Sequence, residues 1–158
     1  MATDIFAKLG DIKGESLDSK HKDEIEVLSY SWGVTNAGSM GYGTGGGEGK
    51  ATFHDLTFVH KVDKASPILM QACATGTHLK EAVITHRKAG KQQQEYLIVK
   101  MNDVIVTGVT HGGNGDGHQE NVSLAFAKVA VEYKPQKPDG TLDAGIIFKY
   151  DIKQQKEA

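Results

Sequence analysis

One stretch of the sequence has helical periodicity, and the segments on either side of it have the pattern of strands and turns. Between Asp63 and Gly76, apolar residues recur at helical spacing: Ala65, Ile68, Leu69, Ala72 and Cys73. Ser66 can cap the helix N-terminus, and Pro67 suits the first helical turn. Gly76 can adopt the left-handed conformation that ends a helix. The sequence therefore predicts one short helix docked on a β-framework.

Composition limits the classes of protein to which the chain can belong. Its 158 residues fit a single domain, and the formal net charge of −2 argues against a nucleic-acid-binding surface. No apolar run approaches the length of a membrane span, and the N-terminus lacks the pattern of a secretory signal. Cys73 is the single cysteine, so no intrachain disulfide can form. We expect synthesis in the cytoplasm, which leaves open export without a signal peptide.

The segment from Glu24 to Thr35 reads as a long strand in which the apolar positions change phase. Ile25 and Val27 alternate with glutamates, and then the apolar set becomes Leu28, Tyr30, Trp32 and Val34. Such a change requires a bulge or a strand whose two ends bury opposite faces. The other face of the second half is small and uncharged: Ser29, Ser31 and Gly33. A face of this kind could line a channel or contact a bound partner.

Two further strands and two glycine-rich segments complete the pattern. Residues 50–60 and Glu95 to Val109 read as strands, the second apolar on both faces and hence buried on both sides, and a turn follows over Gly108 to Gly117. The run from Gly38 to Gly49 does not fit a phosphate-binding loop, which would need glycine at Thr44 and serine or threonine at Ala51. A long hairpin loop that serves as an assembly arm fits it better.

No motif for catalysis or metal binding stands out. The seven histidines are His21, His54, His60, His78, His86, His111 and His118. They lack the close spacing of a zinc site, although His111 and His118 could meet across a hairpin. A nucleophile elbow is absent, and Cys73 lies in an apolar stripe without a nearby base. We therefore predict no enzyme activity, no metal and no cofactor. Phase changes, two-faced strands and a long glycine loop point instead to an oligomeric β-rich protein.

Motifs along nearly the whole chain, in the same order, identify a family. They are Gly14–Ser16, Lys20–Gly33, the glycine-rich run, Asp63–Pro67, Cys73–Gly76, Arg87–Gly90, Gln94–Leu97 and Asn121–Val129. In these residues the chain closely resembles the haemolysin-coregulated protein (Hcp) family of bacterial type VI secretion. The resemblance implies a mainly β fold: a single two-sheet β-barrel-like domain over residues 1–158, with one short flanking α-helix and a long glycine-rich loop.

The resemblance also implies a mechanical function. Family members form homohexameric rings that stack into the inner tube of an injection machine, inside a contractile sheath and beneath a spike protein. The lumen carries and chaperones small effector proteins, and the tube leaves the cell through the apparatus itself. On this chain, Ser29, Ser31 and Gly33 become the expected lumen lining. The expected ring-stacking loop comprises Gly41, Tyr42, Gly43, Thr44, Gly45, Gly46, Gly47, Glu48 and Gly49.

Two other functions are compatible with the residues. A soluble β-sandwich that binds carbohydrate or peptide would use the loops Gly41–Gly49 and Gly112–Gly117 as a binding rim. Its weakness is an aromatic content of only 7%, with one tryptophan. A small hydrolase would need histidine, aspartate and serine side chains that meet only in the folded protein.

Overall fold

A computed structural model describes residues 2–37, 50–90 and 92–158. In this part of the chain the elements are β1 (Thr3–Leu9), β2 (Ile25–Glu26), β3 (Ser29–Ser31), β4 (Val34–Asn36), β5 (Ala51–Phe53), β6 (Leu56–Lys61), α1 (Ser66–Thr75), β7 (His78–Lys88), β8 (Glu95–Asn114), β9 (Gly117–Tyr133), β10 (Ile146–Asp151) and β11 (Lys156–Glu157). The fold is mainly β with one short helix, as predicted, and its two sheets do not close. No described helix is long and apolar enough to cross a membrane.

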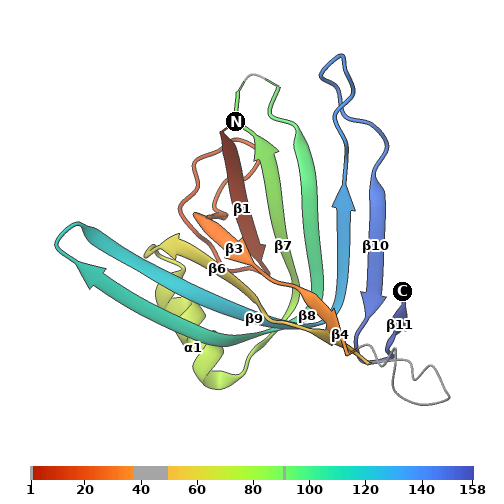
Figure 1. The fold of residues 1–158 in the computed structure, drawn as a ribbon. Coiled ribbons are helices and arrows are strands. Elements are labelled where there is room, and N and C mark those ends of the chain that lie inside the picture. The colour runs from red at the N-terminus through yellow and green to blue at the C-terminus, as the bar shows by residue number, and fades with distance from the viewer. Residues whose placement is uncertain (1, 38–49, 91) are drawn as a thin grey trace.

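The long hairpin β8–β9 organises the molecule (Figure 1). In the larger sheet, which has nine strands, the main path runs β11-β10-β9-β8-β7-β1-β2, and β6 and then β3 branch from the other half of β9. The sheet thus has a first layer, from β11 to β2, and a second layer formed by β3, β6 and the tip-side halves of β9 and β8. The smaller sheet pairs β4 with β5.

The predicted change of phase after Val27 marks the point where the chain changes partner. The N–H of Val27 donates to the carbonyl of Ile5 in β1, whereas the N–H of Leu28 donates to the carbonyl of Val59 in β6. The chain therefore leaves the first layer and enters the second within one residue. The single strand predicted over 24–35 is wrong in its continuity, because β2, β3 and β4 each have a different partner.

Two other strand predictions need correction. Residues 50–60 form two strands, since β5 pairs with β4 and β6 pairs with β3 and β9. The turn predicted from Gly108 is shorter than expected: β8 continues to Asn114 and the chain reverses before Gly117. Gly112 and Gly113 stay in the ladder opposite Gln119 and His118. Glycine is permitted in a strand, but it has no side chain. Gly112 and Gly113 therefore interrupt the alternation of apolar and polar residues by which a strand is recognised in a sequence.

The helix is confirmed, but two of its details differ. Ala65 occupies the N-cap position and helix α1 begins at Ser66, whose hydroxyl accepts a hydrogen bond from the N–H of Asp63. Gly76 ends the helix in the left-handed conformation, as predicted. Leu69 and Ala72 are buried in the core, whereas Ile68 is 47% exposed. The helix packs against β8 and covers only part of the sheet (Figure 1).

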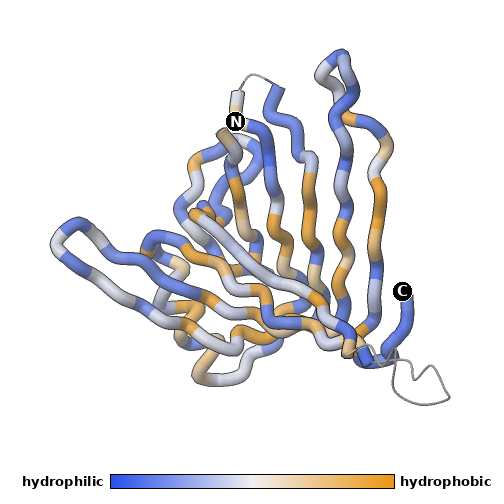
Figure 2. The backbone as a smooth tube through the Cα atoms, in the orientation of Figure 1, coloured by the Kyte–Doolittle hydropathy of each residue, from blue (hydrophilic) through white to orange (hydrophobic). Residues whose placement is uncertain are grey.

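The core lies between the layers and is built from both. Figure 2 shows hydrophobic segments on the strands of each layer. In β8 the residue that faces the core changes from Met101 to Val104, and the Asp103 between them has a positive φ of 54°. On β9 the buried set changes from Val122 and Leu124 to Val129. A change of phase in both strands of the hairpin at the same level lets each layer present its apolar face to one core.

Candidate lumen-facing surface

On one side of the second layer, two adjacent rows of residues across four strands carry no charge, between Asp55 before β6 and Lys61 at its end. Cross-strand pairing aligns Ser29 with Val59, Asn121 and Thr110 in one row. In the next row it aligns Ser31 with Thr57, Ser123 and Gly108. We call these eight residues the uncharged face.

The uncharged face is open to solvent and internally ordered. Ser29, Ser31, Thr110 and Asn121 are exposed, and the other four residues are half-buried. The hydroxyls of Thr57 and Ser123 are hydrogen-bonded to each other at 3.0 Å. Exposed strand faces usually carry lysine or glutamate, so two rows with small side chains and no charge form an unusual solvent surface.

The structure brings together only part of the predicted lumen lining. Ser29 and Ser31 lie in adjacent rows of the uncharged face. Gly33 lies beyond β3, where its carbonyl accepts a hydrogen bond from the N–H of His54. The ring-stacking loop Gly41–Gly49 lies outside the described residues, so the structure does not test it.

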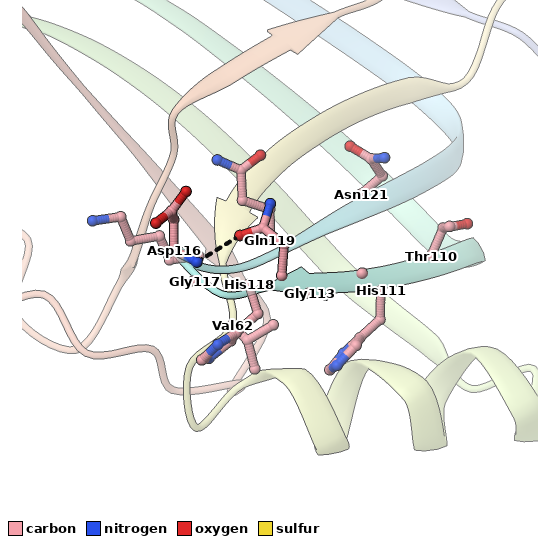
Figure 3. A pocket seen from close by; sticks show the side chains of 12 residues that line it. Val62, Thr110, His111, Gly113, Asp116, Gly117, His118, Gln119 and Asn121 are labelled. Carbon is pink, nitrogen blue, oxygen red and sulfur yellow. Dashed lines mark hydrogen bonds between the residues drawn. The ribbon is translucent and has the colours of Figure 1, made fainter.

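The side chains of the uncharged face point away from the helix. In Figure 3, Thr110 and Asn121 point to the side opposite α1, whereas His111 and His118 point toward α1. The same alternation buries Phe58, Val122 and Leu124 on the core side of these strands. The core therefore fixes the strands, and the face that they present on the other side needs no stabilising contacts of its own.

The core side of the same strands ends in a row of charged residues. His60 on β6 pairs with Glu120 on β9, which pairs with His111 on β8. The His60 Nε2 lies 2.8 Å from Glu120 Oε1, and both side chains are fully buried. The Nδ1 of His60 lies 3.7 Å from Asp63, and the Nδ1 of His111 lies 3.5 Å from the second oxygen of Glu120.

The pKa of His60 reports the balance between burial and these carboxylates. Burial lowers the pKa, whereas the hydrogen bonds and charges of Asp63 and Glu120 raise it, and the net shift is upward from the usual value of 6.5. The two carboxylates thus stabilise the protonated ring by more than burial destabilises it. This row of residues connects three strands to the segment that precedes α1.

Of the two loops of the predicted ligand-binding rim, Gly112–Gly117 lies at a hollow at the tip of the β8–β9 hairpin (Figure 3), and Gly41–Gly49 lies outside the described residues. Its volume is about 770 Å³, and its lining includes Gly112–Asn114, Asp116–Gln119, His111 and Asn121. The amide oxygen of Asn114 accepts a hydrogen bond from the N–H of Asp116 at 2.8 Å and closes the turn. No tryptophan, tyrosine or phenylalanine is among the described residues that line it. Such a hollow lacks the stacking platform that carbohydrate sites use, so the ligand-binding alternative is not favoured.

Histidines 111 and 118 lie on the same side of the hairpin, but they do not form a metal site. Among the residues that the structure describes, no group of three or more His, Cys, Asp or Glu side chains could hold a metal ion. His111 faces Glu120, and His118 pairs with Gly113 across the hairpin.

Sequence reasoning missed six of the eight residues of the uncharged face, which are Thr57, Val59, Gly108, Thr110, Asn121 and Ser123. The alternation in Asn121–Leu124 contained a usable signal, because Asn121 and Ser123 alternate with Val122 and Leu124. On β8 the register shifts between Val106 and Gly108, so simple alternation would not have placed Thr110. The pairing between strands that are distant in sequence carries no local signal at all.

Comparison with known proteins places the whole chain among type VI secretion proteins. A family model described as "Type VI secretion system effector, Hcp" matches residues 6–133. Protein hcp1 of Pseudomonas aeruginosa is 48% identical over 162 residues, with 100% of both chains covered. The crystal structure of Hcp1 from Salmonella typhimurium is 40% identical, with a TM-score of 0.83 and 100% of both chains covered. A solved structure of a type six secretion system protein is 30% identical, with a TM-score of 0.93, and covers 99% of this chain and 100% of its own.

Proposed function

The chain belongs to the Hcp family and is a type VI secretion tube protein, and from this premise we propose that it works as a homohexameric ring whose lumen is lined by the uncharged face. The rings stack into the inner tube of the apparatus, and the lumen holds small effector proteins. We also assign two further protein partners to the tube, the contractile sheath and the spike protein.

The observation that carries the proposal is the absence of charge from the two rows of the uncharged face. Small hydroxyl, amide and glycine positions offer hydrogen bonds without the strong, selective field of charged groups. A cargo can therefore contact this surface weakly at many points and still be released, as a carrier requires. A purely solvent-facing strand surface has no need to exclude charge.

The remaining elements of the proposal follow the same premise. We assign ring-to-ring contact to the loop Gly41–Gly49 and lumen contact to Gly33, in addition to Ser29 and Ser31. We place the protein in the cytoplasm before assembly and assign its export to the secretion apparatus itself. Its role is structural, and we assign it neither a catalytic residue nor a cofactor.

Substitution of Ser31 tests the lumen assignment. Ser31→Trp adds a large ring to the uncharged face at its β3 end, and Ala74→Trp adds the same bulk to an exposed position of α1 as a matched control. We expect both variants to form rings in electron micrographs. In co-expression with an effector of the same secretion system, Ser31→Trp should retain at most about a tenth of the effector that Ala74→Trp retains, because the bulky ring blocks close contact with the face. Equal retention by the two variants would refute the assignment of this face to the lumen.

A further inference from the structure

A small hollow lies at the end of the first layer where β1 begins and β7 ends, near the N-terminus marked in Figure 1. Its volume is about 260 Å³. The residues that line it come from four neighbouring strands, β1, β7, β8 and β9, and from the segment after β9. They are Thr3, Lys88, Tyr96, Tyr133, Lys134 and Gln136. We call this site the basic hollow.

The basic hollow carries an excess of positive charge. Lys88 and Lys134 are both half-buried, and no aspartate or glutamate is among the described residues that line the hollow. Glu132 lies 3.8 Å from Lys134 but outside the lining, so it offsets part of one lysine charge. Two ammonium groups that share a hollow repel each other, and an anion between them would turn this repulsion into attraction.

The side chain of Lys88 is held in place at the hollow. Its ammonium group donates a hydrogen bond to the side-chain oxygen of Gln136, and the amide nitrogen of Gln136 donates to the carbonyl of Gly140 at 3.3 Å. The backbone N–H of Lys88 donates to the carbonyl of Gln94 at 3.0 Å, and Lys88 pairs with Thr3 across the sheet. Because this lysine is already ordered, a ligand loses less entropy when it binds.

A β-bulge brings the hydroxyl of Tyr96 into the same hollow. His86 pairs with Leu97 and Arg87 pairs with Glu95, so Tyr96 is the extra residue on β8. Simple alternation from Leu97 would place Tyr96 on the side of the sheet opposite His86. Instead the two rings lie 5.8 Å apart, and the Tyr96 hydroxyl lies 3.4 Å from the hydroxyl of Thr3. Bulges re-aim side chains in this way and are frequent at functional sites.

The hydroxyl of Tyr96 also connects the hollow to a buried histidine. It lies 3.5 Å from Nδ1 of His86, whose Nε2 is buried and has no hydrogen-bond partner among the described residues. The ring otherwise faces Tyr30 of β3 and its strand partners Ile5 and Leu97. Burial lowers the pKa of His86, so its ring is neutral at neutral pH. A neutral ring carries its proton on one nitrogen only, and the hydrogen bond with Tyr96 decides which one.

We propose that the basic hollow binds a phosphate group, either as the free ion or as part of a small phosphorylated molecule. Lys88 and Lys134 supply two positive charges, and the hydroxyls of Thr3 and Tyr96 supply two uncharged donors. A phosphate monoester carries a charge of about −1.5 to −2 at pH 7 and three strong acceptor oxygens, which matches this set. A carboxylate has a single charge and would leave one lysine unmatched. This binding site does not depend on the proposed lumen.

Bound phosphate should change the state of His86 through Tyr96. When the Tyr96 hydroxyl donates its hydrogen to a phosphate oxygen, its own oxygen is left to accept a hydrogen bond from His86. His86 must then carry its proton on Nδ1, which fixes one tautomer of the ring. This response distinguishes an anion inside the hollow from one that binds to lysines on the surface.

Isothermal titration calorimetry of the full chain with inorganic phosphate tests the site. We expect saturable binding of one phosphate per chain. Lys134→Met should weaken it at least about tenfold, because a charged hydrogen bond is lost. Lys153→Met is the matched control, since it removes the same charge from an exposed lysine that pairs with Asp103. Acetate should bind at least about tenfold more weakly than phosphate. Phosphoserine distinguishes the two sources: tighter binding than inorganic phosphate indicates a phosphorylated molecule, and weaker binding indicates the free ion.

Nuclear magnetic resonance of the histidine-labelled chain tests the connection to His86. Addition of phosphate should move the ring-nitrogen signals of His86 toward the Nδ1–H tautomer, and His86→Gln identifies these signals. In Tyr96→Phe the aromatic ring remains but the hydroxyl is lost, so binding should weaken and the signals of His86 should no longer respond. Circular dichroism that matches the natural chain ensures that each variant is folded.

Two results would overturn the inference. Absence of saturable phosphate binding, or equal affinities for Lys134→Met and Lys153→Met, would refute the phosphate site. An unchanged response of His86 in Tyr96→Phe would refute the role of Tyr96 as a ligand of the anion.

Discussion

Two buried ion pairs stabilise different parts of this protein, and they differ in whether their charges can titrate near neutral pH. Arg87 on β7 is only 2% exposed and binds Asp18 and Asp4. It thereby fastens the loop between β1 and β2 to β7 and β1. His60 and Glu120 fasten β6 to β9 behind the uncharged face. The Arg87 site lies beneath the loop that contains Leu17, and the His60 site lies behind the proposed lumen surface.

The two ion pairs differ in their response to pH, because one contains an arginine and the other a histidine. The hydrogen bonds from Arg87 hold the pKa of Asp18 well below its usual range, so both partners stay charged across the physiological range. Arg87 also lies over the Phe6 ring, 5.0 Å from its centroid, which further fixes the guanidinium. The pKa of His60 is raised only by its carboxylate neighbours, Asp63 and Glu120, against the lowering effect of burial. The Arg87–Asp18 ion pair that holds the loop is therefore insensitive to pH, whereas the His60–Glu120 ion pair behind the uncharged face depends on pH.

Removal of the Arg87 charge should have the largest effect on stability. Arg87→Met leaves Asp18 and Asp4 without their partner and should lower the free energy of unfolding by about 3 kcal/mol. The measurement is urea denaturation at a fixed protein concentration, since assembly adds to apparent stability. Lys100→Met is the control, because Lys100 and Glu81 form an exposed pair at 3.3 Å and its loss should cost at most about 0.5 kcal/mol. Equal effects of the two substitutions would show that the Arg87 site is no stronger than a surface ion pair.

Loss of charge at Glu120 should have a smaller effect. Glu120→Gln keeps the shape of the side chain but leaves His60 with Asp63, at 3.7 Å, as its remaining carboxylate. We expect a loss of about 2 kcal/mol in the same denaturation experiment, because a buried charged hydrogen bond becomes a weaker one. Unchanged stability would mean that desolvation already cancels the attraction within this pair.

The smallest effect, and the one that separates the two sites most sharply, is the dependence on pH. The folded state raises the pKa of His60, so its contribution to stability is complete below the usual value of 6.5 and is lost as the pH rises through the folded value. The natural chain should lose stability over that range more steeply than His60→Gln does. Arg87→Met should keep the slope of the natural chain. Identical slopes for the natural chain and His60→Gln would exclude titration of His60 as the cause.

The sequence predicted local features of this fold well and its long-range pairings poorly. The end of the helix at Gly76 and the change of phase after Val27 depend on neighbouring residues and were found. The predicted cap at Ser66 was wrong because Ala65 occupies the cap position. The exposure of Leu28 depends on how far the next layer covers it, which no local pattern encodes.

The candidate site shows the same limit. Ser29 and Ser31 were found because small residues alternate with Tyr30 on one strand. The extension of the uncharged face across β6, β9 and β8 depends on cross-strand register. The partnership of His60 with Glu120, which are 60 positions apart, depends on it too. The family resemblance led us to expect a lumen-facing surface, but it did not predict which residues of β6, β9 and β8 would lie beside Ser29 and Ser31.

The order of strands in the first layer also sets the order in which the chain can fold. The hairpin β8–β9 joins neighbouring segments, and β10 then adds to β9, so this half closes through short loops. Strand β1 must instead find β7, where Thr3 pairs with Lys88, and Asp18 must find Arg87, 69 positions away. Contacts between distant segments form slowly. During synthesis and folding, β8, β9 and β10 should thus pair before β1 joins β7, and the N-terminal loop becomes ordered last, when Asp18 reaches Arg87.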